Sequence, residues 1–171
     1  MRLNAVLVRG VFGLSLVMAV TLTWAQLVQQ TRWQGYTALA RDVAQGRSAA
    51  EDMARLEPLL ARDGHEPCAV LRGGTPVTLH LYASDLLAQA AGTNPFLPAD
   101  DPRLTAQRQA ARAVLEQAVA CAPMDGNLWL SLAVLARALD EDPAQTVRYL
   151  AFSERYAPHE GWISDRRAQL F

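Results

Sequence analysis

Apolar residues recur at intervals of three and four positions along most of the chain, which is the spacing of one face of an α-helix. The clearest example is the segment 125–139. One of its faces consists of Trp129, Leu132, Ala133, Ala136 and Leu139. Other apolar residues fill much of its remaining surface, so we expect this helix to be the most buried element, enclosed by its neighbours. Alternation at period two is nearly absent, and the pattern therefore predicts an all-α fold with almost no sheet.

Pairs of a capping residue and a proline mark where several helices begin. Asp101-Pro102 and Asp142-Pro143 each place a side-chain acceptor before a proline in the first helical turn. They predict helices that run to about residue 121 and to about residue 156. Thr75-Pro76 predicts a third start, and Gly92 ends that helix. The segment 159–171 is predicted to be a short amphipathic helix that covers the open end of the stack.

Two further helices are predicted nearer the N-terminus. The first spans about residues 31–45 and ends at Gly46. The second is opened by a capping box at Ser48–Glu51, in which two side chains satisfy free backbone N–H groups. Pro58 lies inside this helix and is expected to bend it. The glycine-rich segment 63–74 is predicted to be a connector.

The N-terminal segment is predicted to anchor the chain in a membrane. Two arginines precede a run without charged residues from Gly10 to Thr31, and roughly 20 apolar residues suffice to cross the hydrocarbon core. This interpretation divides the chain into a cytoplasmic segment 1–10, a transmembrane anchor 11–30 and one domain, 31–171, outside the cytoplasm. The anchor residues that we single out are Val11, Phe12, Leu14, Leu16, Val17 and Trp24.

Two other interpretations of this segment stay open. Thr23-Trp24-Ala25 places small residues where a signal peptidase requires them, so that cleavage before Gln26 would release the domain. The segment would otherwise be a helix buried in the protein core, although no periodic polar face interrupts the apolar run.

Composition and charge narrow the class of protein. The chain has 171 residues, which suits one domain. Its net charge of −1 gives no sign of nucleic-acid binding. All 16 basic residues are arginine, and the chain contains no lysine. Neither the composition nor the charge of the chain indicates an oligomeric state.

Cys68 and Cys121 are the two cysteines of the chain. Cys68 lies in a predicted loop before one helix and Cys121 ends the next helix, so antiparallel packing of the two helices would bring the cysteines together. A Cys68–Cys121 disulfide then fits an oxidising compartment such as the periplasm. The alternative is a pair of unbonded, partly buried thiols.

The sequence shows no catalytic constellation. His65, His80 and His159 lie far apart, whereas a structural zinc site needs four ligands. The acidic runs stand at helix starts and in loops, where capping and the helix dipole explain them. An enzyme would have to use the acidic loops, with Asp100 and Asp101 as the best candidates. Because phosphate-loop, dinucleotide-binding and hydrolase motifs are also absent, we expect a protein that is not an enzyme and binds no cofactor or metal.

Four apolar side chains are candidate contacts with a protein partner. Phe96 and Leu97 lie between prolines in the long loop 92–101, where they either plug the groove between neighbouring helices or touch a partner. Tyr149 and Trp162 are the other two candidates, and for them the alternative is packing in the core.

The helical pattern resembles the tetratricopeptide repeat, in which antiparallel helix pairs stack side by side. The matching residues are Ala111, Leu115, Ala118 and Pro123 for the second half of one repeat, and Trp129, Leu132, Ala133 and Ala136 for the first half of the next. Pro123 and Pro158 lie 35 residues apart, against a period of about 34. The second unit therefore needs an insertion, and it has Leu150 and Ser153 where the repeat has an aromatic residue and an alanine. The resemblance implies a stack of about six or seven helices.

The last third of the chain also resembles small membrane-anchored repeat proteins associated with bacterial polysaccharide biosynthesis and export. The residues that carry this resemblance are Pro123, Asp125, Trp129, Leu132, Ala133, Ser153, Pro158, Glu160, Trp162 and Arg167. The resemblance implies an inner-membrane anchor, a periplasmic domain and an accessory role without catalytic residues.

The leading hypothesis is a non-catalytic scaffold or accessory protein of a bacterial envelope assembly, which binds protein partners in the inner membrane or periplasm. The anchor would confine the domain near its partner and so raise the local concentration. The alternative hypothesis is a small structural subunit of a larger integral-membrane complex, of the respiratory, photosynthetic or secretion type, whose transmembrane helix makes specific contacts.

Overall fold

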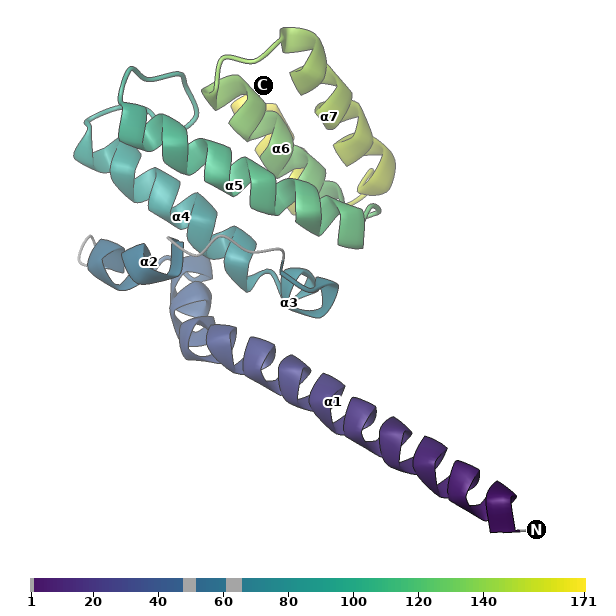
Figure 1. Ribbon diagram of the computed structural model, residues 1–171. Helices are drawn as coiled ribbons and strands as arrows, with labels where there is room; N and C mark the ends of the chain where they lie inside the picture. The colour runs from purple at the N-terminus through teal and green to yellow at the C-terminus, as the bar shows by residue number, and fades with distance from the viewer. Residues whose placement is uncertain (1, 48–51, 61–65) are drawn as a thin grey trace. The chain divides into compact units, whose positions relative to one another are not determined.

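The computed structural model describes residues 2–47, 52–60 and 66–171, and every regular element within these ranges is a helix (Figure 1). The helices are α1 (Arg2–Ala44), α2 (Asp52–Leu60), α3 (Cys68–Arg72), α4 (Thr75–Ala90), α5 (Pro102–Cys121), α6 (Gly126–Ala138), α7 (Pro143–Tyr156) and α8 (Gly161–Leu170). The prediction of an all-α fold is therefore confirmed for these ranges. The chain consists of two compact units, Met1–Ala38 and Leu39–Phe171, and the boundary between them lies within α1.

α1 is one continuous helix, whereas the sequence predicts a membrane segment and then a separate helix over residues 31–45. The difference arises because no residue before Pro58 is a proline, which would interrupt the helix. A glycine inside a long helix costs only about 1 kcal/mol, which is too little to end it. The helix ends at Ala44, and Gly46 adopts a φ of 69°, in agreement with the predicted stop. The predicted capping box at Ser48–Glu51 lies outside the described residues.

Within the described part of the chain, no helix is both long and apolar enough to cross a membrane.

Two details before α4 correct the prediction. The expected connector contains the short helix α3, which forms because Pro67 holds an extended backbone before Cys68–Arg72, and because Ala69, Leu71 and Arg72 are strong helix formers. Cys68 is therefore the first residue of a helix and does not lie in a loop. α4 begins at Thr75 itself, and its cap is Gly74, whose φ of 73° a glycine adopts without steric cost.

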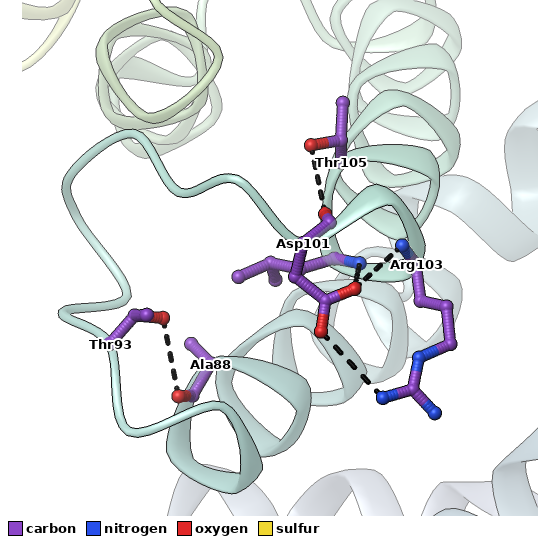
Figure 2. Close-up of polar contacts among 6 residues, drawn as sticks. Ala88, Thr93, Asp101, Arg103 and Thr105 are labelled. Atoms are coloured by element: carbon purple, nitrogen blue, oxygen red, sulfur yellow. Dashed lines mark hydrogen bonds and ion pairs between the residues drawn. The ribbon is translucent and has the colours of Figure 1, made fainter.

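Aspartate side chains open α5, α6 and α7. In α5, Asp101 accepts hydrogen bonds from the backbone N–H of Arg103 at 2.8 Å and of Leu104 at 3.3 Å, as Figure 2 shows around the start of this helix. Asp125 and Asp142 cap α6 and α7 through their own carboxylates. A proline follows the cap in α5 and in α7, so both predicted Asp–Pro starts are confirmed.

Consecutive helices pack against each other from α4 onward. α4 lies along α5, α5 along α6, and α6 along α7, while α8 packs on α6 (Figure 1). α6 is thus enclosed by α5, α7 and α8, as its apolar surface predicts. α8 buries Ile163 against Leu130 and Ala157, which gives the end of the stack a covering helix.

A disulfide joins Cys68 at the start of α3 to Cys121 at the end of α5, and the two Cα atoms are 5.3 Å apart. The short helix packs against both α4 and α5. The Nε atom of Arg72 also donates to the backbone carbonyl of Cys121 at 3.1 Å. α3 is therefore tied to the C-terminal end of α5 by a covalent bond and a hydrogen bond.

Packing between the last three helices accounts for several residues that carry the family resemblance. The indole N–H of Trp129 donates to the carbonyl of Pro123 at 2.8 Å and so fixes the turn before α6. The guanidinium of Arg167 donates to the hydroxyl of Ser153 at 3.1 Å and to the carbonyl of Ala157 at 3.3 Å. These contacts tie α8 to the end of α7, so a structural role explains these residue types.

Gly126 is expected to tolerate no side chain. A Cβ atom added to this first residue of α6 would lie 2.4 Å from the Cβ of Ala157 and 2.9 Å from the carbonyl oxygen of Ser153. Because the chain at the end of α7 would have to shift, Gly126→Ala should lower the free energy of unfolding by about 3 kcal/mol. Urea unfolding followed by circular dichroism measures the loss. Gly161→Ala is the control, since nothing lies within 4 Å of its added Cβ, and equal stability of the two variants would contradict the prediction.

Candidate functional site

The four side chains predicted to contact a partner have different surroundings. Trp162 is 56% exposed and Leu97 is 39% exposed, so both are accessible on the surface. Tyr149 is 7% exposed, and its ring centroid lies 5.9 Å from that of Trp129. The packing of α7 on α6 covers this side chain, which favours the alternative that Tyr149 packs in the core. Phe96 is half-buried.

Phe96 forms part of the wall of a cavity between α4 and α6, which we call the α4–α6 cavity. Its volume is about 40 Å³. The lining residues are Leu81, Ser84, Asp85, Pro95, Phe96, Leu130, Ser131, Val134, Leu135 and Arg166. The loop 92–101 thus fills part of the space between two helices, which favours the plugging interpretation of Phe96. This volume is far below the roughly 300–1,000 Å³ of pockets that hold a whole small molecule, so the cavity suits a single functional group.

Asp85 is the acidic group of the α4–α6 cavity. Burial raises the pKa of this carboxyl to about 6, and the positive charges of Arg166 and Arg108 oppose the shift only in part. No residue in the described part of the chain donates a hydrogen bond to this carboxylate. A half-buried carboxylate without hydrogen bonds costs stability, and such groups in cavities are candidates for function.

Arg108 holds the loop against the cavity. This residue of α5 is 1% exposed. Its guanidinium donates to the carbonyl of Ala138 at the end of α6 at 2.7 Å, and to the carbonyl of Pro95 in the loop at 3.0 Å. The first contact places a cation at a helix C-terminus, where the helix dipole favours it. Because both Nη groups of Arg108 are bonded to carbonyls, this residue positions Pro95 and does not pair directly with Asp85.

Two serines add hydroxyl groups to the cavity lining. The hydroxyl of Ser131 donates to the backbone carbonyl of Asn127 at 3.0 Å, so its oxygen has only acceptor capacity left. Ser84 lies on α4 next to Asp85, and Arg166 reaches the cavity from α8. The cavity therefore combines acceptor oxygens from α4 and α6 with one exposed cation at its edge.

Asp85→Asn is expected to stabilise the protein at neutral pH. The folded-state pKa of about 6 exceeds the ordinary value of 3.8, so the folded state keeps a proton that the unfolded state releases between about pH 4 and pH 6. The wild type therefore loses stability as the pH rises through this interval, and the uncharged asparagine does not. We expect the variant to be more stable by about 2 kcal/mol near pH 7.5 and equally stable near pH 4.

Urea unfolding at both pH values tests this expectation. Asp165→Asn is the matched control, because Asp165 is an exposed carboxylate on α8. A gain in stability at pH 4 as large as the gain at pH 7.5 would show that the charge of Asp85 is not the cause.

Neither Asp85 nor Arg108 is predicted from the sequence. A signal exists for Arg108, since Leu104, Arg108, Ala111 and Leu115 follow helical spacing and all four are buried. An arginine in the middle of an apolar face indicates a buried cation that needs carbonyl partners. The sequence signal for Asp85 is weaker. An acidic residue that follows an apolar residue by one helical turn also occurs on helix faces that are exposed to solvent.

α1 carries a separate, exposed apolar surface. The large apolar side chains exposed there are Leu14, Leu16, Val17, Met18, Val20, Leu22, Trp24, Leu27 and Val28. Four predicted anchor residues belong to this set, and the side chains of Val11 and Phe12 lie outside the described part. Contiguous apolar surface on a protein marks a site that another molecule covers.

Comparisons with protein-family models, with curated proteins and with solved structures find no match for this chain. The resemblances seen in the sequence therefore rest on the residues quoted for them. Among the described residues, no group of three or more His, Cys, Asp or Glu side chains is placed to hold a metal ion. The α4–α6 cavity and the exposed apolar surface of α1 are therefore the two candidate sites.

Proposed function

We propose that the protein is a non-catalytic, membrane-anchored accessory protein of a bacterial envelope assembly, and that this assembly makes or exports a polysaccharide. Residues 11–30 anchor the chain in the inner membrane with the N-terminus in the cytoplasm. Residues 31–171 form a tetratricopeptide-like stack in the periplasm, where the stack binds a protein partner.

The exposed apolar surface of α1 carries the proposal. Nine large apolar side chains between Leu14 and Val28 are exposed, and the sequence has no charged residue from Gly10 to Thr31. An apolar surface of this extent needs an apolar cover, which the hydrocarbon core of a membrane supplies. Trp24 lies near the end of the run, where the indole suits the interface between lipid and water.

The remainder of the proposal draws on the helical stack and on the disulfide. Stacked helix pairs offer extended surfaces that suit the binding of another protein. A disulfide between Cys68 and Cys121 suits an oxidising compartment. The polysaccharide assembly is proposed from the residues of the last third of the chain that resemble this class.

A truncation that begins at Gln34 is expected to stay folded and to lose function. It keeps the compact unit Leu39–Phe171 and removes the apolar surface of α1. The full-length chain should fractionate with membranes and co-purify in mild detergent with glycosyltransferases, polymerases or export proteins, whereas the truncation should do neither. Mass spectrometry of the purified full-length chain identifies both the partners and the mature N-terminus. Full complementation in cells by the truncation, or a mature chain that starts at Gln26, would contradict the anchor.

A small structural subunit of a larger integral-membrane complex is the second candidate. It is favoured by a hollow on α1 of about 290 Å³, lined by Ala19, Val20, Thr23, Trp24 and Leu27. Ala19 and Thr23 are small side chains four residues apart, and pairs with this spacing let a second helix approach closely in a membrane. Replacement of residues 11–28 by an unrelated apolar helix separates the two candidates. Loss of assembly supports the structural subunit, and unchanged assembly argues against it.

A further inference from the structure

We propose that the α4–α6 cavity receives the ammonium group of a lysine side chain from a protein partner. The inference deepens the proposed function and rests on it, since that function requires a partner bound to the helical stack.

Among the described residues, no hydrogen bond reaches the oxygens of Asp85 and Ser131, although the guanidinium of Arg166 and the hydroxyl of Ser84 also line the cavity. Asp85 receives no hydrogen bond from any described residue, and the hydroxyl of Ser131 has already given its proton to Asn127. Ser84 contributes a third oxygen next to Asp85. An ammonium group brings three N–H donors and no acceptor, so it complements oxygens from three side chains.

The dimensions of the cavity suit an ammonium group with the adjoining methylene. A volume of about 40 Å³ exceeds the roughly 10–15 Å³ that one water molecule needs, so the cavity can hold a small polar group together with the carbon next to it. Leu81, Leu130 and Val134 supply apolar walls, against which the aliphatic part of a lysine packs.

The charge of Asp85 also points to a cationic ligand. A cationic ligand would offset the cost of a half-buried carboxylate that receives no hydrogen bond from a described residue. Two cations act on the Asp85 carboxylate: Arg166, which lines the cavity, and Arg108, which is not part of its lining. Arg108 is bonded to the carbonyls of Ala138 and Pro95, and the exposed Arg166 is the one that a partner lysine would displace.

The lysine has to come from another molecule, because the chain contains none: all 16 basic residues are arginine. A cavity that fits a lysine therefore cannot be filled by a second copy of this chain. The absence of lysine also simplifies the test, since amine signals from a lysine probe do not overlap with side-chain amines of the protein.

The test titrates the full-length protein in mild detergent, near pH 7.5, with N-acetyl-lysine-methylamide and monitors binding by NMR. The matched probes are the arginine derivative, the uncharged norleucine derivative and methyl glucoside, a neutral polyol. We expect the lysine probe to bind at least about tenfold more tightly than the two uncharged probes, since it supplies a hydrogen-bonded ion pair to Asp85. We also expect it to bind more tightly than the arginine derivative, whose planar guanidinium is larger than the compact ammonium group.

Variants assign the effect to the cavity. Asp85→Asn, which is expected to be a stable protein, should lower the affinity for the lysine probe by about tenfold or more. Arg166→Gln should strengthen it because a competing cation is removed, and Asp165→Asn should leave it unchanged. Equal binding of the norleucine probe, preferential binding of methyl glucoside, or unaltered binding to Asp85→Asn would each overturn the proposal.

These measurements separate the inference from the function on which it rests. Failure of the lysine titration, with membrane fractionation and co-purification intact, removes the lysine site and leaves the accessory role. Loss of the accessory role in cells, with lysine selectivity intact, leaves an ammonium site on a protein of another function.

Discussion

Arg108→Ala should lower the free energy of unfolding by about 4 kcal/mol. Arg108 is the largest fully buried side chain of the described residues, with 1% exposure. Its removal leaves a cavity, and truncation of large buried side chains to alanine costs roughly 2–5 kcal/mol. It also leaves the carbonyls of Ala138 and Pro95 without their donor, each at a cost of about 1 kcal/mol or more.

Chemical unfolding of the full-length chain measures this loss. Arg103→Ala is the matched control on the same helix, because Arg103 has an 81% exposed side chain and one weak ion pair with Asp101 at 3.7 Å. We expect the control to cost less than about 1 kcal/mol. If the two alanine variants were equally stable, the anchoring role of Arg108 would be refuted. Arg108→Met, which keeps most of the volume, separates the cost of the cavity from the cost of the unbonded carbonyls.

Reduction of the Cys68–Cys121 disulfide is the second large effect. The bond joins residues that are 53 positions apart, and opening a loop of this length should lower the free energy of unfolding by about 4 kcal/mol in the chain-entropy account. The destabilisation should appear as a shift of the urea midpoint when a reductant is added.

The double variant Cys68→Ser with Cys121→Ser provides the control for this second effect. It should be as unstable as the reduced wild type, and a reductant should not change it. Under non-reducing conditions the wild type should be lighter than its reduced form by the mass of two hydrogen atoms. Two alkylatable thiols in the native, unreduced protein would contradict the bond.

Helix boundaries are the feature that the sequence predicts best, because each depends on a few neighbouring residues. The Asp–Pro starts of α5 and α7 and the glycine stops after α1 and α4 are such local signals. α3 escapes prediction because five residues are too few to show a period. The sequence also does not predict Gly74 as the cap of α4, because the threonine before Pro76 is a commoner capping residue.

The candidate site is less predictable, because it depends on which helices meet. Asp85 and Arg166 lie far apart in the sequence and reach one cavity only through the packing of α4 and α8 with α6. The burial of Tyr149 also depends on which helices meet. Its face of α7 is not distinguishable from a surface stripe until α6 is seen to cover it.

The packing of consecutive helices has a consequence for how the chain assembles. Helices α4 to α8 contact mainly their neighbours in sequence, so the relative contact order is low and folding should be complete within about milliseconds. A chain that emerges N-terminus first can form α4 and α5 before α6 has appeared. Because both cysteines precede α6, oxidation of the thiols requires none of the C-terminal helices, and a nascent chain that ends at about residue 125 should already be competent for it.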